Sequence, residues 1–250
     1  MNLTKRFFPR DIRESGLTTI TAHSACEGTA PNSREHIVAA ISSGAEYIEV
    51  DIRYDGELLY LAHDESEPSS ECVKLSTLFE LIAPYPTIFV NCDVKTDGLL
   101  ELVHDLAALY GVENRILFTG CCNHRPTECA ALGADLWHSL FFLRRGANDA
   151  EIKEFNEGQI REAVEYCKKT NCPYINLSYR LVNEENIAYV KKNGLDYSVW
   201  TVDDEEMIRF LLEQHVANIT TRKPVLALKL RSEIQGSPES HGLKPYDQLR

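Results

Sequence analysis

Short runs of β-branched and apolar residues alternate along the chain with longer segments in which apolar residues recur every three or four positions. The short runs are typical of strands and the longer segments of amphipathic helices. Strands are expected at 17–23, 47–54, 57–63, 87–95, 115–120, 135–142, 174–180, 195–202 and 217–221. Helices are expected at 33–44, 75–85, 98–110, 127–132, 158–169, 184–193, 205–215 and 225–234. Ser33 and Gly44 fit the N-cap and the C-terminal stop of the first of these helices.

One pair of expected strands breaks this alternation. Only Asp55-Gly56 separates 47–54 from 57–63, which is the signal of a two-residue hairpin. With the segment 57–63 set aside as a hairpin arm, every remaining strand is followed by a helix, as in a parallel sheet. Eight such units in a chain of about 250 residues predict closure into a (β/α)8 TIM barrel.

The barrel is expected to form a single domain over residues 1–235, followed by a polar C-terminal tail at 236–250. The alternative is an open, doubly wound sheet that binds a dinucleotide. Such a sheet carries a glycine-rich fingerprint after its first strand. Here the corresponding segment, AHSACEG, holds one glycine, which favours the barrel.

Composition narrows the range of partners. The formal net charge of −12 disfavours nucleic acid, because an acidic surface repels phosphate backbones. No apolar stretch reaches the ~18 residues that a transmembrane span requires. The first residues, MNLTKRFFPRDIRESG, lack the apolar core of a signal peptide. We therefore expect a cytoplasmic protein whose eight cysteines are mostly buried thiols.

Residues capable of chemistry gather where strands are expected to end, which is where barrel enzymes place their catalytic groups. These residues are His23, Glu49, Asp51, His63, Asp93 and Lys95. Side chains two positions apart on a strand share a face, so Glu49 pairs with Asp51 and Asp93 with Lys95. An acid–x–acid pattern is also common on solvated sheet faces, but helices cover the outside of a barrel. The set therefore favours a functional site inside the barrel mouth.

Three converging carboxylates repel one another unless a cation joins them. Oxygen ligands suit one hard divalent ion, Mg²⁺ or Ca²⁺. Lys95 adds a positive charge for an anionic small-molecule substrate, and His23 and His63 form a natural acid–base pair near neutral pH. Trp200 is expected either to form an apolar wall of the mouth or to pack in the core.

The order of these motifs resembles the glycerophosphodiester phosphodiesterase family from about Ile20 to Pro224. The matching segments are AHSACEGTAPNS, IEVDIR, AHDES, NCDVK and SVWTVDDEEMIRFLLEQHVANITTRKP. The resemblance implies a barrel hydrolase of lipid metabolism that uses one divalent cation to cleave a phosphodiester into glycerol phosphate and an alcohol. It also implies catalysis by His23 and His63, a metal held by Glu49, Asp51 and Asp93, and a phosphate contact from Lys95.

The sequence departs from this family at three positions. Ser24 stands where the family has arginine, Asn32 where it has glutamate, and Asp93 where it has the longer glutamate. Arg180, at the end of the sixth barrel strand, is expected to replace part of the lost phosphate contact, and Arg53 to pair with Glu49 or Asp51. Two alternatives remain: a phosphodiesterase for another phospholipid headgroup, and a catalytically weakened ligand-binding homologue.

Overall fold

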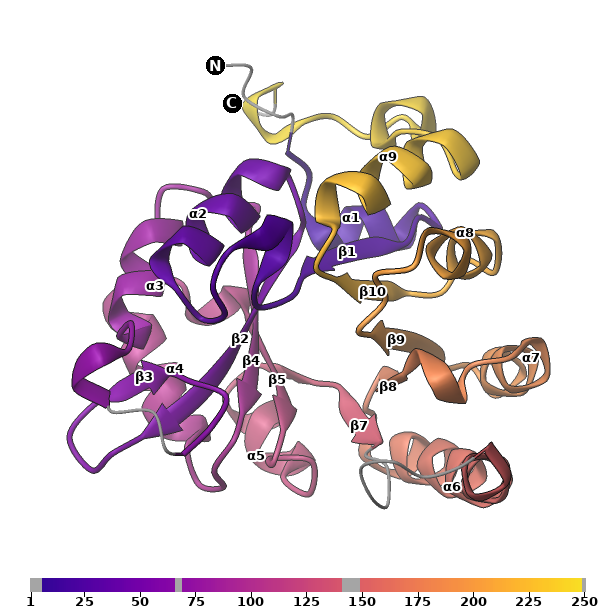
Figure 1. Ribbon diagram of the computed structural model, residues 1–250, viewed down its shortest axis with the longest axis horizontal. Coiled ribbons are helices and arrows are strands. Elements are labelled where there is room, and N and C mark those ends of the chain that lie inside the picture. The colour runs from indigo at the N-terminus through magenta and orange to yellow at the C-terminus, as the bar shows by residue number, and fades with distance from the viewer. Residues whose placement is uncertain (1–5, 66–68, 141–148, 249–250) are drawn as a thin grey trace.

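The computed structural model describes residues 6–65, 69–140 and 149–248, and these form a barrel of parallel strands surrounded by helices (Figure 1). The strands are β1 (Thr19–Ala22), β2 (Tyr47–Tyr54), β3 (Leu59–Leu61), β4 (Phe89–Val94), β5 (Ile116–Gly120), β6 (Asp135–Leu136), β7 (His138–Leu140), β8 (Tyr174–Ser178), β9 (Asp196–Trp200) and β10 (Asn218–Thr221). The helices are α1 (Pro9–Glu14), α2 (Arg34–Ser43), α3 (Leu75–Ile82), α4 (Leu100–Leu109), α5 (Pro126–Ala131), α6 (Asp149–Thr170), α7 (Glu184–Lys192), α8 (Glu205–Glu213) and α9 (Pro224–Ile234).

The segment that contains β6 and β7 closes the barrel. In the order of hydrogen-bonded neighbours, β6 and β7 are the two ends of the sheet. They are consecutive in sequence, separated by Trp137, whose main-chain N–H donates to the Phe118 carbonyl of β5 at 3.0 Å. Because β6 pairs with β5 and β7 pairs with β8, one chain segment joins the two halves of the sheet. The predicted (β/α)8 barrel is therefore confirmed, with β3 as an antiparallel arm on β2. The predicted strand 135–142 extends beyond the described residues at its end.

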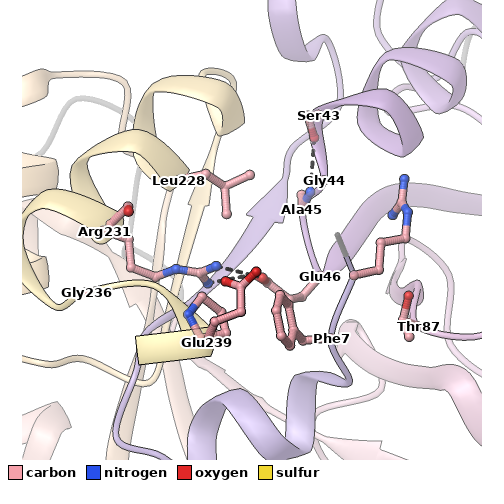
Figure 2. Close-up of a pocket in the computed structure, with 13 residues that line it drawn as sticks. Phe7, Ser43, Gly44, Ala45, Glu46, Thr87, Leu228, Arg231, Gly236 and Glu239 are labelled. Atoms are coloured by element: carbon pink, nitrogen blue, oxygen red, sulfur yellow. Dashed lines mark hydrogen bonds and ion pairs between the residues drawn. The ribbon is translucent and has the colours of Figure 1, made fainter. Parts of the chain in front are cut away.

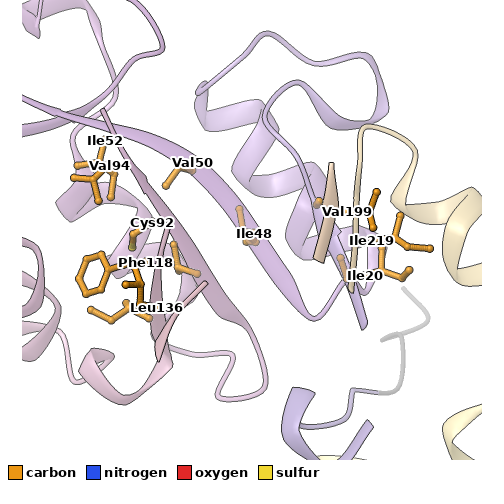
Figure 3. Close-up of a cluster of buried hydrophobic side chains, with 14 of the residues drawn as sticks. Ile20, Ile48, Val50, Ile52, Cys92, Val94, Phe118, Leu136, Val199 and Ile219 are labelled. Carbon is orange, nitrogen blue, oxygen red and sulfur yellow. The ribbon is translucent and has the colours of Figure 1, made fainter. Parts of the chain in front are cut away.

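Strand side chains alternate between the helices and the barrel interior. On β2, Ile48, Val50 and Ile52 are fully buried and belong to the main apolar cluster (Figure 3). Glu49 and Asp51 occupy the intervening positions and point into the barrel. This alternation places the apolar side chains between the sheet and the helices, and the carboxylates in the interior of the barrel.

Aromatic residues close the amino-terminal end of the barrel. Trp137 packs edge-to-face against Tyr47 and Tyr174, with ring centroids 5.5 and 5.4 Å away. Arg13 of α1 lies 5.4 Å from the centre of the Tyr174 ring and donates a hydrogen bond to its hydroxyl. The barrel therefore opens for a ligand at its carboxyl end.

A cavity of about 290 Å³ lies near this closed end, between the N-terminal segment and α9 (Figure 2). Its wall holds a buried ion pair in which Arg231 Nη1 and Nη2 donate to the two Glu46 oxygens at 3.1 and 3.0 Å. Glu46 also accepts from the Ile20 main-chain N–H at 2.8 Å. The pair therefore fixes α9 to the start of the first two strands.

The segment after α9 returns to the start of the chain, so the described ends lie together (Figure 1). The Tyr246 main-chain N–H donates to the Arg6 carbonyl at 2.8 Å, and the Tyr246 ring meets Phe8 edge-to-face. In the described part of the chain, no helix is long and apolar enough to cross a membrane.

Candidate active site

A cavity of about 400 Å³ opens at the carboxyl ends of the strands. Most of the residues expected to form a site line it, namely His23, Glu49, Asp51, His63, Asp93, Lys95 and Trp200. Arg180 is not among its lining residues; it lies exposed in the 3₁₀ turn Tyr179–Leu181 that follows β8. Among the expected residues, the barrel thus brings together side chains that lie up to 177 residues apart in the sequence, from His23 to Trp200.

Glu49, Asp51 and Asp93 form an acidic cluster in this cavity. One carboxylate oxygen from each residue can be chosen so that all three lie within 4.8 Å of one another. The pairing of β2 with β4 sets Asp51 directly beside Asp93. Glu49 and Asp51 are buried, at 4% and 3% exposure. Three such oxygens on rigid strands fit a hard divalent cation.

Lys95 joins two members of the acidic cluster. Its Nζ lies 2.7 Å from Asp51 Oδ1 and 2.6 Å from Asp93 Oδ2. Burial disfavours its charge, but Asp93, Asp51 and Glu49 together raise the pKa of Lys95 above its ordinary value. One ammonium therefore faces three carboxylates, and negative charge remains in excess.

The excess charge falls on Glu49 and Asp93, because burial, together with the charge of Asp51, also leaves the pKa of Asp93 above its ordinary value. Burial, and then the charges of Asp51 and Asp93, raise the pKa of Glu49 well above its usual range. Burial alone would also raise the pKa of Asp51, but Lys95 and the hydrogen bond from Asn32 lower it. A bound cation would relieve this repulsion, so the electrostatics agree with the donor set.

Asn32 positions Asp51 from the loop before α2. Its Nδ2 donates to Asp51 Oδ2 at 2.8 Å, and its Oδ1 accepts from the Asp51 main-chain N–H at 3.1 Å. Asn32 has a left-handed φ of 52°, a conformation that asparagine adopts more readily than most residues. The Asn32 amide therefore holds the Asp51 carboxylate in place.

His23 lies at the end of β1 with one ring nitrogen fixed. Nδ1 is 2.7 Å from the Ser24 carbonyl, which can only accept, so Nδ1 carries the proton. Nε2 then has a free lone pair, 3.9 Å from Glu49 Oε2. Burial lowers the pKa of His23, which favours the neutral ring. This arrangement suits a proton acceptor.

His63 reaches the cavity from the loop after β3 and is much more exposed. Its side chain is 67% exposed, and Nδ1 lies 3.0 Å from Asp64 Oδ1. Arg53 donates from Nε and Nη2 to the His63 carbonyl at 3.2 and 2.8 Å. Arg53 thus fixes the backbone of this loop. Among the described residues its carboxylate neighbour is Glu65 at 4.0 Å, and not Glu49 or Asp51 as expected.

The cavity also has lining residues that the sequence did not reveal. They are Asn91, Thr119, Ser139, Asn176, Thr201, Thr220 and Arg222. Asn91 had a detectable signal, because it lies two positions before Asp93 on the same strand face. Arg222 directly follows the closing strand β10, a position that could have marked it as a mouth residue.

The structure is therefore a parallel (β/α)8 barrel with an acidic cluster, a lysine and two histidines in the cavity at the carboxyl ends of its strands. No family model matches the sequence, and no curated protein matches it. Several solved structures are similar to this chain. A protein of Agrobacterium tumefaciens assigned as a glycerophosphoryl diester phosphodiesterase has a TM-score of 0.74 at 16% identity, covering 88% of this chain and 100% of that one.

Two further structures show the same likeness. A glycerophosphodiester phosphodiesterase of Thermotoga maritima has a TM-score of 0.66 at 17% identity, over 85% of this chain and 98% of that one. A phosphodiesterase of Oleispira antarctica, in complex with the product sn-glycerol-3-phosphate, has a TM-score of 0.65 at 17% identity, over 89% of this chain and 98% of that one. At these identities the likeness establishes a shared fold.

Proposed function

We propose that this protein is a metal-dependent phosphodiesterase that hydrolyses glycerophosphodiesters to glycerol phosphate and an alcohol. The observation that carries the proposal is the acidic cluster, with Lys95 between two of its carboxylates and both histidines in the same cavity. The glycerol phosphate bound to the Oleispira antarctica phosphodiesterase supports a small-molecule substrate of this class.

Glu49, Asp51 and Asp93 would hold one divalent cation, Mg²⁺ or Ca²⁺. When bound, such an ion offsets negative charge on phosphoryl oxygens. Lys95 offsets part of the charge of Asp51 and Asp93, and its charge lowers the pKa of Asp51 against the effect of burial. Asn32 and the Ser24 main-chain N–H, which donates to Glu49 Oε2 at 3.1 Å, fix the carboxylates in position.

The two histidines differ in the way that acid–base catalysis requires. His23 Nε2 accepts a proton from the nucleophile, which is water or a neighbouring hydroxyl of the substrate. The nucleophile attacks phosphorus as the bond from phosphorus to the leaving oxygen breaks. His63, oriented by Asp64, donates its proton to that alkoxide oxygen. Trp200 forms a wall beside the leaving group.

Hydrolysis assays test this function. We expect glycerophosphocholine and glycerophosphoethanolamine to release glycerol phosphate in the presence of Mg²⁺ or Ca²⁺, and excess EDTA to abolish the release. Lysophosphatidylcholine and sphingomyelin, assayed in parallel, test the alternative headgroups. Full turnover in EDTA would refute the metal-dependent mechanism. Binding of a phosphodiester without turnover under any of these conditions would favour a ligand-binding protein.

A further inference from the structure

The loops after β1 and β10 lie side by side at the cavity mouth. The two strands pair in parallel, with Ala22 opposite Thr221. Beyond the strands, the His23 N–H donates to the Thr221 carbonyl at 2.9 Å and the Glu27 N–H to the Arg222 carbonyl at 2.8 Å. Arg222 is therefore held next to His23 on the cavity wall.

Asp203, which follows β9, orients the Arg222 side chain. Asp203 Oδ2 accepts from Arg222 Nη1 at 2.8 Å, and Oδ1 accepts from the Arg222 main-chain N–H at 2.8 Å. The Thr221 hydroxyl donates to the same Oδ1 at 3.3 Å. Asp203 thus anchors both the backbone and the guanidinium, so Arg222 keeps one orientation at lower entropic cost.

The guanidinium retains capacity for a second anion. It has five N–H donors, and within the described residues Asp203 is its one carboxylate partner. The Arg222 side chain is 46% exposed, so a ligand in the cavity can reach it. Lys95, by contrast, already faces two carboxylates, at 2.7 and 2.6 Å, which take two of its three N–H donors and offset its charge. Arg222 is then the best placed fixed positive charge for a substrate anion among the described residues that line the cavity.

We propose that Arg222, oriented by Asp203, binds the phosphate group of the substrate beside His23. This inference rests on the proposed function for the identity of the ligand, a phosphate ester. A guanidinium can form two parallel hydrogen bonds to phosphate oxygens, which an ammonium cannot. Arg222 would thereby supply the positive charge that Ser24 does not.

Kinetics of the metal-loaded full chain test this role. We expect Arg222→Ala to raise KM for glycerophosphocholine, and Ki for sn-glycerol 3-phosphate as product inhibitor, by about 10–100-fold. Arg222→Lys should recover part of the loss, because it restores the charge without the planar fork. Lys223→Ala is the matched control: it removes the same charge one residue away, from a side chain outside the cavity lining, and should leave both constants unchanged.

Asp203→Asn tests the positioning. We expect it to raise KM in the wild-type background but to add little in Arg222→Ala, since the two side chains act as one unit. Fully additive effects would show that Asp203 does not act through Arg222. Unchanged KM and Ki in Arg222→Ala, or equal shifts in Lys223→Ala, would overturn the proposal.

A binding measurement distinguishes failure of this proposal from failure of the proposed function. If wild type hydrolyses no diester, the function fails, and calorimetric titration with sn-glycerol 3-phosphate still tests Arg222. Binding by wild type that is lost in Arg222→Ala would support the site. Equal binding by both proteins, or none by either, would refute it. Circular dichroism and thermal melting of Arg222→Ala and Arg222→Gln exclude unfolding as the cause of a loss.

Discussion

Gly120, the last residue of β5, leaves open the space that the Asp93 carboxylate occupies on the neighbouring strand. A Cβ at position 120 would collide with Asp93 Oδ1 and with the Val94 carbonyl. Gly120 also has a φ of +90°, which side chains rarely tolerate. The close approach of these two residues fixes where Asp93 presents its carboxylate oxygens.

Replacement of Gly120 should therefore damage the acidic cluster. We expect Gly120→Ala to weaken Mg²⁺ and Ca²⁺ binding by tenfold or more and to destabilise the fold by about 1–3 kcal/mol. Gly98→Ala is the control, because Gly98 has a similar φ of +83° but no atom near its would-be Cβ. Calorimetry and urea unfolding measure the two effects. Equal metal affinity in both variants would mean that Asp93 does not ligate the ion.

Removal of one cluster charge should separate metal binding from folding. Because Asp51 and Asp93 repel a charged Glu49, we expect Glu49→Gln to keep or raise the melting temperature in EDTA. The same variant should lose the rise in melting temperature that Mg²⁺ or Ca²⁺ gives wild type. Glu57→Gln, at an exposed position, serves as control. A full metal-induced rise in Glu49→Gln would exclude Glu49 from the ligand set.

The histidines should affect turnover far more than stability. We expect His23→Ala and His63→Ala each to lower kcat by about 10²–10⁴-fold, the usual span for acid–base groups. His124→Ala is the control, since that side chain is 63% exposed and outside the cavity lining. Stopped assays and thermal melts give the comparison. Near-normal turnover in either cavity variant would leave that histidine with a structural role.

Local sequence patterns were sufficient for the barrel and for the three carboxylates that gather in the acidic cluster. Strand β2 runs from Tyr47 to Tyr54 as predicted, and Ser33 caps α2 by accepting from the His36 N–H at 3.0 Å. Strand periodicity also set Glu49 and Asp51 on one face. Helix α1 was missed because its six residues are mostly charged and only Pro9 and Ile12 among them are buried. Such a helix depends on tertiary packing, which no local pattern reports.

The choice between two arginines at strand ends could not be made from the sequence. Arg180 and Arg222 both follow barrel strands, so both were in position to face the mouth. A 3₁₀ turn leaves Arg180 outside the cavity lining, whereas Asp203 and the loop after β1 hold Arg222 inside it. These contacts join segments up to about 200 residues apart, and they exist only once the barrel has closed.

The free energy of unfolding should depend on pH through His138 of β7. Its ring lies on the opposite strand face from Ser139 and stacks on Tyr166, with centroids 4.3 Å apart. Its Nδ1 is buried and has no hydrogen-bond partner among the described residues. Burial lowers the pKa of His138 to about 4, against an ordinary value of 6.5.

Below about pH 6.5, His138 is therefore protonated in the unfolded chain, whereas in the native protein its ring stays neutral until about pH 4. This histidine's contribution to stability is complete above pH 6.5 and is lost as the pH falls toward 4, with a loss of about 2 kcal/mol by pH 5. We expect His138→Phe, which keeps the ring packing but cannot titrate, to unfold in urea with a free energy that falls less between pH 7.5 and 5. The decisive quantity is the difference between wild type and variant at each pH, because carboxylates that titrate in both proteins cancel from it. The same difference at both pH values would mean that water reaches the native His138 ring and that the ring is protonated there as readily as in the unfolded chain.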